Sequence, residues 1–212
     1  VHPTSAGLII RLPEGGERHV EPNPTASLRL VEVWGDTVEA CSVSPSVDAW
    51  LSSWLDTPVS LVHMPETTYR RVDEHFARRD DTVSFADGFS LLLISQGSLD
   101  ALNRKLEKPV GMDRFRPNLV VDGCAPFAED QWRHIRIGEC TFDIVKPCGR
   151  CVMVNVDPAT GETSREPLRT LNTFRARDRE VLFGQNLVHR TTGVLDVGAT
   201  VRIMDAMSEG AA

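Results

Sequence analysis

The sequence predicts a mainly β protein with helical additions (α+β). Short apolar segments recur along the chain, and clusters of Gly, Pro, Asp and Ser separate them. Helical spacing of apolar residues is confined to a few short stretches, whereas from residue 117 onward most segments alternate apolar and polar residues. Many short strands with few helices are typical of a β-barrel-like core that carries helical additions.

The first forty residues favour strands, and a helix follows them. Apolar runs at residues 8–12 and 28–33 end in turn residues, which predicts two strands. Ser44 and Pro45 suit the N-cap and the first position of a helix. One buried stripe of this helix is expected from the spacing of Val47, Trp50, Leu51, Trp54 and Leu55.

The middle of the chain contains a polar segment followed by a short apolar segment. Residues 64–88 are polar and charged, so they read as a connector between two structural units. The apolar run at residues 91–94 is expected to be a buried strand or the entry to a helix. Ser98 is the predicted N-cap of a second helix, whose buried face would be formed by Leu99, Leu102 and Leu106.

From residue 117 onward the sequence predicts several further elements. They are a strand at 119–121, a hairpin of residues 135–137 and 142–144, a strand at 152–156, a short helix after Glu166–Pro167, and a final hairpin within residues 194–203.

Charge and composition exclude some classes of function. The net charge is −7, from 30 acidic and 23 basic residues, which argues against a protein that binds nucleic acid through a basic face. No run approaches the roughly 20 apolar residues that span a bilayer. Five cysteines without disulfide spacing, and no visible targeting pattern, predict a soluble protein of the reducing cytoplasm that has no membrane partner.

The most specific motif for a chemical function is a pair of cysteines separated by two residues, in the segment Lys146–Pro147–Cys148–Gly149–Arg150–Cys151. Structural zinc would need a second ligand pair at similar spacing, and a thioredoxin-like pair would be expected where a strand enters a helix. Here the motif is expected to enter a strand. Two ordinary cysteines, or one thiolate that binds a soft or high-valent metal, are the other interpretations, and the spacing alone does not name a metal.

Two further segments contain groups that bind ligands. Arg114 and Arg116 frame an aromatic residue before a proline, and such guanidinium forks can bind a phosphate or a carboxylate; paired surface arginines remain an equal alternative. Residues 183–186 join a glycine to the amides of Gln185 and Asn186, which could hydrogen-bond a heterocycle.

Across residues 85–205 the motifs, in order, resemble those of the MOSC domain family, in the branch of bacterial N-hydroxylated-base reductases and the mitochondrial amidoxime reducing component. The similar segments are residues 114–121 (RFRPN strand entry), 128–132 (acidic loop and Trp), 137–139 (IG hairpin), 146–151 (KPCSRC), 157–161 (DP-x-TG), 166–171 (EPLxTL) and 183–186 (FGQN). Residues 33–36 and 84–88 also resemble the N-terminal barrel domain of this branch and the junction that follows it. The resemblance implies a MOSC β-barrel over residues 81–206, preceded over residues 1–80 by the remainder of the N-terminal β-barrel domain.

The resemblance also implies a molybdenum cofactor, molybdenum bound to molybdopterin, with Cys151 as the metal ligand and catalytic residue. Cys148 is then expected to be a packing residue. Gly149 stands where the family usually has serine, and residues 96–97 depart from the family's serine-containing loop. The residues expected to bind the cofactor are Arg116, Asn118, Gly149, Arg150, Ser95, Ser98, Gln185 and Asn186.

The activity implied by the resemblance is the two-electron reduction of N-hydroxylated compounds, from N–OH to N–H. A small N-hydroxylated substrate and a separate iron–sulfur or flavin electron donor are the expected partners. A sulfur-carrying protein with a persulfide at Cys151 and a non-catalytic binding module are the alternatives. The family's upstream segment that grips the cofactor phosphate is expected to be absent from this chain.

Overall fold

The computed structural model describes residues 1–23 and 25–206 and divides the chain into two compact units. The first unit comprises residues 1–71 and 82–87, and the second comprises residues 72–81 and the chain from residue 88 onward. The chain therefore leaves the first unit, enters the second and returns once before the second unit is completed. The domain boundary predicted between residues 80 and 81 stays a prediction.

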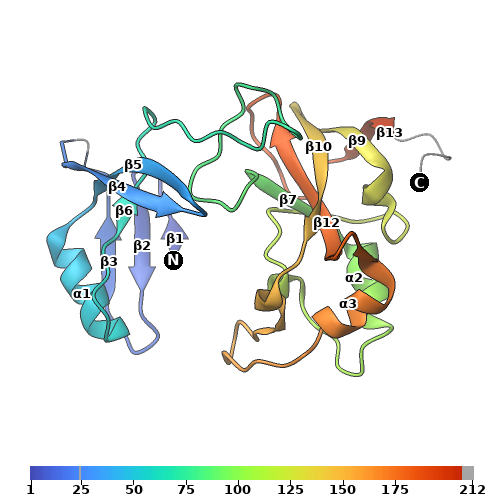
Figure 1. The fold of residues 1–212 in the computed structure, drawn as a ribbon, viewed down its shortest axis with the longest axis horizontal. Helices are drawn as coiled ribbons and strands as arrows, with labels where there is room; N and C mark the ends of the chain where they lie inside the picture. The colour runs from blue at the N-terminus through green and yellow to red at the C-terminus, as the bar shows by residue number, and fades with distance from the viewer. Residues whose placement is uncertain (24, 207–212) are drawn as a thin grey trace. The chain divides into compact units, whose positions relative to one another are not determined.

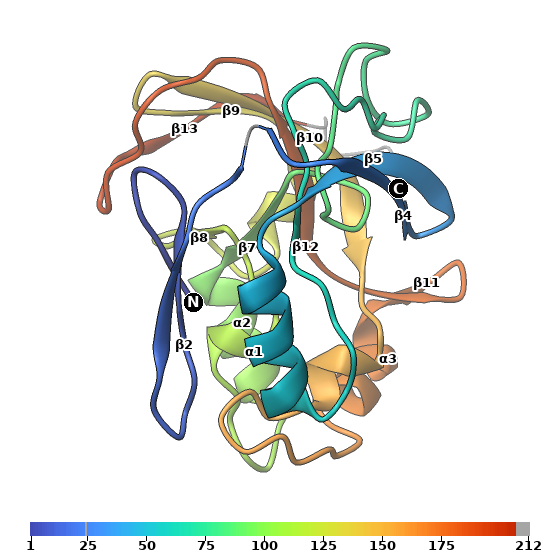
Figure 2. The same cartoon turned by 90° about the vertical axis from the view of Figure 1, so that its left-hand side faces the viewer.

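Two three-stranded antiparallel sheets and one α-helix form the first unit (Figure 2). The strands expected at residues 8–12 and 28–33 are present as β2 and β4. One sheet contains β1 (His2–Pro3), β2 (Leu8–Arg11) and β3 (Glu17–Val20), and the other contains β4 (Leu28–Val33), β5 (Asp36–Ser42) and β6 (Val62–His63).

Helix α1 (Pro45–Leu55) begins where the sequence predicts, with Ser44 in an extended conformation at the N-cap. Val47 is buried among residues of β2 and β3, and Trp50 and Leu51 pack against the same cluster. The C-terminal part of the predicted stripe differs, because Trp54 and Leu55 are 43% and 46% exposed. The stripe is thus buried at Val47, half-buried at Trp50 and Leu51, and exposed beyond them.

A curled seven-stranded sheet forms the second unit, and its main path has the order β13–β9–β10–β12–β7–β8 (Figure 1). All its pairs are antiparallel except β7–β8, and β11 pairs with β12. The mainly β fold class with helical additions is confirmed. The strands are β7 (Leu91–Ser95), β8 (Leu119–Val121), β9 (Trp132–Ile137), β10 (Cys140–Gly149), β11 (Ala176–Arg177), β12 (Glu180–His189) and β13 (Val201–Ala206).

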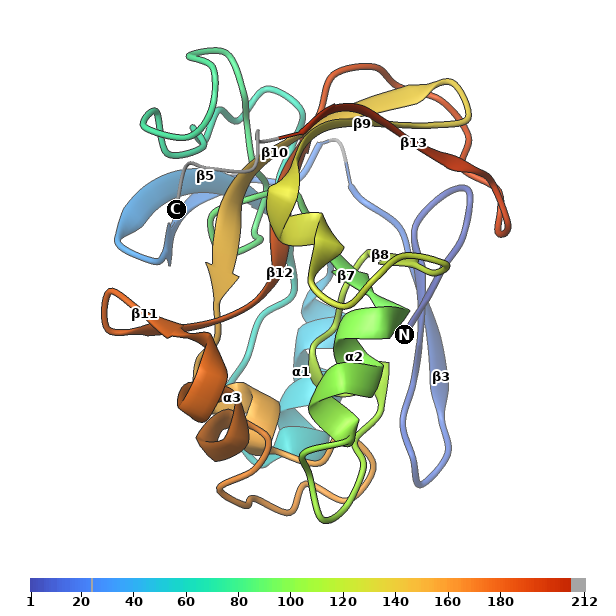
Figure 3. The same ribbon diagram turned by 90° about the vertical axis from the view of Figure 1, so that its right-hand side faces the viewer.

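Two α-helices of this unit lie below the strands in the views of Figure 1 and Figure 3. They are α2 (Gln96–Asn103) and α3 (Leu168–Arg175), and the described part of the chain adds the 3-10 helices η1 (Met112–Arg114), η2 (Ala128–Gln131) and η3 (Val152–Asn155). The helices enclose an apolar cluster with one side of the sheet. Its buried members are Ile94, Leu99, Leu102, Phe115, Val154, Leu171 and Phe183.

Three local predictions are wrong. The N-cap of α2 is Ser95, whose hydroxyl accepts a hydrogen bond from the backbone N–H of Ser98 at 3.0 Å. The strand predicted at 152–156 is the 3-10 helix η3. The predicted final hairpin does not form, because β13 pairs with β9.

Among the described residues, no helix combines the length and the apolar character that crossing a membrane requires.

Candidate functional site

Three sequence motifs meet at Phe115. This side chain is 1% exposed, and its ring centroid lies 4.5 Å from that of Phe183 in β12. The guanidinium of Arg150 lies 5.7 Å from the centre of the Phe115 ring, and its Nη2 donates a hydrogen bond to the Phe115 carbonyl at 2.9 Å. Segments 114–118, 148–151 and 183–186, which are far apart in the sequence, therefore share one buried aromatic contact.

The two cysteines of the Cys148–Cys151 segment are in different environments. Strand β10 ends at Gly149, and the backbone N–H of Arg150 donates to the carbonyl of Val181 at 2.7 Å. Cys148 is half-buried, with Nη1 of Arg150 3.2 Å from its Sγ. Cys151 follows as the N-cap of η3 and is exposed, whereas each of the other four cysteines is buried or half-buried. Cys151 is therefore the most accessible thiol of the chain.

The 3-10 helix after Cys151 removes one argument made from the sequence. A thioredoxin-like pair was disfavoured there because the motif was expected to enter a strand, and it enters η3 instead. Local secondary structure therefore does not decide between the interpretations of the motif. Among the described residues, no group of three or more His, Cys, Asp or Glu side chains is arranged to hold a metal ion.

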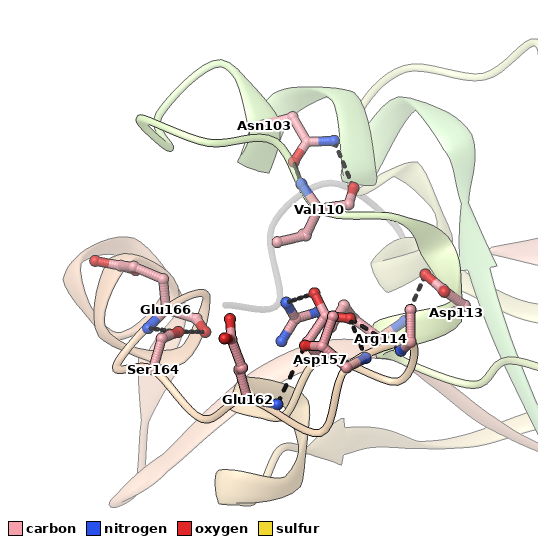
Figure 4. A network of polar contacts seen from close by, with 10 residues as sticks. Asn103, Val110, Asp113, Arg114, Asp157, Glu162, Ser164 and Glu166 are labelled. Atoms are coloured by element: carbon pink, nitrogen blue, oxygen red, sulfur yellow. Dashed lines mark hydrogen bonds and ion pairs between the residues drawn. The ribbon is translucent and has the colours of Figure 1, made fainter.

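Arg114 forms an ion pair across the site (Figure 4). Its Nη2 lies 2.7 Å from Oδ2 of Asp157, while Oδ1 of Asp157 accepts a hydrogen bond from the backbone N–H of Ala159 at 2.9 Å. The backbone N–H of Ala159, together with that of Thr160 and the charge of Arg114, lowers the pKa of Asp157 although burial opposes this shift. Asp157 therefore stays ionised and fixes the position of the Arg114 guanidinium.

Two buried guanidinium nitrogens near Phe115 have no hydrogen-bond partner in the described part of the chain. They are Nη1 of Arg114 and Nε of Arg150. A buried donor without a partner is costly, and such groups in a native protein call for an explanation. Each of the two nitrogens is a donor that could hydrogen-bond to an anionic group placed beside it.

Gly149 leaves little room for a larger residue. A Cβ added at this position would lie 3.0 Å from Oε1 of Glu180. The serine that the motif resemblance leads one to expect here would therefore require the Glu180 side chain to move. The predicted cofactor contact of Gly149 stays a prediction.

Arg116 and Asn118 follow Phe115 on the exposed side of the segment. Arg116 has a φ of +53°, a left-handed conformation that residues other than glycine adopt rarely. Asn118 pairs with Leu92, since its Oδ1 accepts from the Leu92 N–H at 2.8 Å and its own N–H donates to the Leu92 carbonyl at 2.9 Å. Asn118 thereby anchors the start of β7, and the cofactor roles of both residues stay predictions.

Ser95 and Ser98 lie together in the interior, and both are fully buried. The Ser95 hydroxyl donates to Oγ of Ser98 at 2.8 Å, and the Ser98 hydroxyl donates to Oε1 of Glu129 at 2.7 Å. Burial, opposed by a hydrogen bond with Ser95, raises the pKa of the neighbouring Cys124 thiol, and the negative charge of Glu129 adds to this shift. The two hydroxyls are engaged inside the protein, so their predicted contact with a cofactor stays a prediction.

Gln185 and Asn186 occupy the middle of β12. Gln185 is 2% exposed, and its Nε2 donates to Oδ1 of Asp130 at 2.7 Å. The other carboxylate oxygen of Asp130 lies 2.7 Å from Nη1 of Arg175. Asn186 is half-buried and lies opposite Leu92 in the sheet register. The Gln185 side chain therefore makes its hydrogen bond inside the second unit. A cofactor role for the amide of Gln185 or of Asn186 stays a prediction.

Sequence reasoning missed Glu129 and Asp157 as partners of the predicted site residues. Both stand in motifs that the sequence analysis names, the acidic loop and the DP-x-TG turn. The acidic residue in each motif was the signal that the sequence offered. The partner of Glu129 is Ser98, and the partner of Asp157 is Arg114. Each partner lies more than thirty positions away, so local patterns could not identify it.

The MOSC domain family matches residues 80–202 of the chain. The chain belongs to the MOSC domain family. A mitochondrial amidoxime-reducing component 1 from Danio rerio is 40% identical over 179 residues, which cover 80% of this MOSC chain and 55% of the relative. The corresponding protein from Xenopus laevis is 36% identical over 211 residues, which cover 92% of this chain and 62% of the relative.

A molybdenum cofactor sulfurase from Oryza sativa subsp. japonica is 34% identical over 171 residues, which cover 73% of this chain and 21% of the relative. The MOSC chain thus spans little more than half the length of the amidoxime-reducing relatives and a smaller share of the sulfurase. The family and these named relatives are associated with the molybdenum cofactor.

The predicted cytoplasmic location is wrong. The amidoxime-reducing relatives from Danio rerio, Xenopus laevis and Homo sapiens are named as mitochondrial proteins. The prediction used the absence of a targeting pattern in this sequence, which is not a sufficient basis for a compartment.

Proposed function

We propose that this chain is the cofactor-binding part of a molybdenum-dependent reductase that converts N–OH groups to N–H groups, with Cys151 as the metal ligand. One observation carries the proposal: an exposed thiol follows directly after an arginine that has an unpartnered buried nitrogen. The relatives named amidoxime-reducing components support the reaction class.

The residues of the site fit the cofactor chemically. A thiolate is a suitable ligand for a soft or high-valent metal, and Cys151 is accessible to one. The cofactor also carries a phosphate, and the unpartnered donors of Arg114 and Arg150 suit an oxyanion because guanidinium groups form charge-assisted hydrogen bonds with phosphate. When bound, the molybdenum cofactor supplies two-electron redox chemistry at the metal.

The protein's own groups position the site. Arg150 donates to the Cys148 sulfur and to the Phe115 carbonyl, so its guanidinium ties the segment that precedes Cys151 to the segment of Phe115. The aromatic contact of Phe115 with Phe183 keeps this anchor rigid, because both rings are fully buried. The loop can thereby present the Cys151 thiolate in a fixed orientation.

The proposed substrates are small N-hydroxylated compounds such as amidoximes, and the proposed electron source is a separate iron–sulfur or flavin protein. Two electrons and two protons convert the N–OH group to N–H and release the oxygen as water. Cofactor contacts by Arg116, Asn118, Gly149, Ser95, Ser98, Gln185 and Asn186 belong to the same proposal.

The proposal is tested by measuring the reduction of an aryl amidoxime by the full-length protein, with a reduced viologen dye as electron source. The wild-type protein is expected to form the amidine, and Cys151→Ala is expected to lose more than roughly hundredfold in rate, because losing a ligand exceeds the 10–100-fold effect of disturbing a ligand's neighbours. Cys124→Ala is the matched cysteine control and should retain the wild-type rate. Wild-type turnover by the Cys151→Ala variant would refute the assignment.

The relatives named molybdenum cofactor sulfurase favour one second candidate, a sulfur carrier with a persulfide on Cys151. Sulfur released by cyanide from metal-free wild-type protein, and absent from Cys151→Ala, would support this function. Molybdenum in the wild-type protein without labile sulfur would support the reductase.

A further inference from the structure

Two arginines face each other at one edge of the sheet of the second unit. Arg136 in β9 and Arg202 in β13 are direct partners in the antiparallel register. Like charges directly opposite each other in a sheet are destabilising. Both arginines are exposed, so solvent screens their repulsion, and the pair costs a small amount of stability unless a negative charge lies between or beside the guanidinium groups.

A surface cavity of about 230 Å³, open to solvent on one side, lies at this pair and is lined by Arg136, Gly138, Thr200 and Arg202. The Nε of Arg136 donates to the carbonyl of Gly138 at 2.9 Å, which orients its guanidinium in the hairpin between β9 and β10. This bond leaves the two terminal nitrogens of Arg136 available to a ligand.

No carboxylate neutralises the pair within residues 1–23 and 25–206, where neither Arg136 nor Arg202 takes part in an ion pair. In contrast, Arg190 of the same unit contacts both Asp81 and Asp143. The chain has seven more acidic than basic residues, yet in the part that the structure describes this pair forms no ion pair.

We propose that this cavity binds a phosphate group, as inorganic phosphate or as a small phosphate monoester. Two guanidinium groups provide several charge-assisted donors, which match a dianion with three or more acceptor oxygens better than they match a carboxylate with two. The volume is below the roughly 300–1,000 Å³ of pockets for drug-sized ligands, so the ligand is smaller than a nucleotide.

This site is separate from the Cys151 site. Arg136 lies opposite Thr141 near the start of β10, and Gly149 is at the end of the same strand. Eight residues of β10 separate Thr141 from Gly149, which corresponds to at most about 27 Å at roughly 3.4 Å per residue, since two register shifts shorten the strand. The phosphate site therefore does not depend on the proposed cofactor chemistry.

The test is a titration of the ¹⁵N-labelled full-length protein with inorganic phosphate, glycerol 3-phosphate or acetate, each compared with chloride at equal ionic strength. The amide signals of Gly138 and Thr200 are expected to shift with the two phosphates. Arg136→Gln and Arg202→Gln are each expected to weaken binding about tenfold, because each change removes charge-assisted hydrogen bonds. Arg133→Gln, an equal change of charge on β9, should bind phosphate as the wild type does.

Thermal unfolding gives a second test, in which the substitutions that weaken phosphate binding are expected to raise the unfolding temperature of the free protein. Without phosphate, the Arg136→Gln/Arg202→Gln double variant is expected to unfold at a higher temperature than the wild type, because the like-charge contact is gone. With phosphate, only the wild type should gain stability. Tighter binding of glycerol 3-phosphate than of inorganic phosphate identifies a monoester as the ligand, and equal or weaker binding identifies free phosphate. Acetate that binds as tightly as phosphate, or phosphate binding unchanged in the double variant, overturns the proposal.

Discussion

Replacing Arg190 with methionine is expected to lower the free energy of unfolding by about 3 kcal/mol, the lower end of the range for breaking a buried ion pair. Arg190 donates from Nη1 to Asp81 at 2.6 Å and from Nε to Asp143. Its side chain is 12% exposed, and those of Asp81 and Asp143 are 11% and 19% exposed. The variant leaves both carboxylates in poorly hydrated positions without their shared cation. Chemical denaturation at neutral pH measures the difference.

The same change is expected to alter the dependence of stability on pH. Burial opposes ionisation of Asp81, but the hydrogen bonds from Arg190 and from the backbone N–H of Arg78 outweigh it and lower the pKa of Asp81. A lowered pKa means that this contribution is complete above the unfolded-state pKa and is lost as the pH falls through the folded-state pKa. The gap between wild type and Arg190→Met should therefore be widest near neutral pH and should narrow below about pH 4.

Arg177→Met is the matched control. Its ion pair with Asp178 is exposed, with side chains 72% and 92% accessible, so this change should cost less than about 1 kcal/mol. Equal effects of the two substitutions, or an Arg190→Met gap that does not depend on pH, would contradict the role given to Arg190.

Replacing Phe115 with alanine is expected to lower the free energy of unfolding by about 3–5 kcal/mol, as large-to-small changes of buried aromatic residues do. The ring is 1% exposed and packs on Phe183 at 4.5 Å between centroids. It also supports the guanidinium of Arg150. The variant should therefore also mobilise the loop before Cys151, seen as faster hydrogen exchange at Arg150 than global unfolding explains.

Val120→Ala, in the neighbouring strand β8, is the control because this side chain is 51% exposed. Its effect should stay within about 0.5 kcal/mol. Phe115→Leu separates the two roles of the ring, since it keeps an apolar side chain but removes the aromatic face. A loss below about 1 kcal/mol for Phe115→Ala would show that the ring is not central to the packing.

Local patterns predicted the elements whose partners are close in sequence. The hairpin of β9 and β10 and the helix α3 follow directly from alternation, helical spacing and turn residues. The segment 152–156 shows where such a pattern fails. Its alternating valines suggest a strand, yet Val154 and Asn155 are buried in succession, and the Asn155 Oδ1 accepts a hydrogen bond from Leu168 N–H. These tertiary contacts favour a turn of 3-10 helix.

Partners distant in sequence could not be predicted. Alternation indicated a strand near residues 201–203, but nothing local indicated that β13 pairs with β9. Likewise, Ser95 and Ser98 were both candidate polar residues of the site. Their hydrogen bonds run to Glu129, about thirty positions later, and this makes them part of the interior.

The candidate site itself was predicted as a set of motifs and not as an arrangement. The sequence named Arg114, Arg150 and Cys151. The contact of their segments at Phe115, and the different surroundings of Cys148 and Cys151, depend on the fold.

The measurement that tests the account most directly is the molybdenum content of the purified full-length protein, determined by mass spectrometry for the wild type and for Cys151→Ala, Cys148→Ala and Cys124→Ala. Equimolar molybdenum is expected in the wild type and in Cys124→Ala, reduced but detectable metal in Cys148→Ala because Arg150 loses a contact, and no molybdenum in Cys151→Ala. Circular dichroism confirms that each variant is folded. Molybdenum retained in full by folded Cys151→Ala would contradict the assignment of this thiolate as the metal ligand.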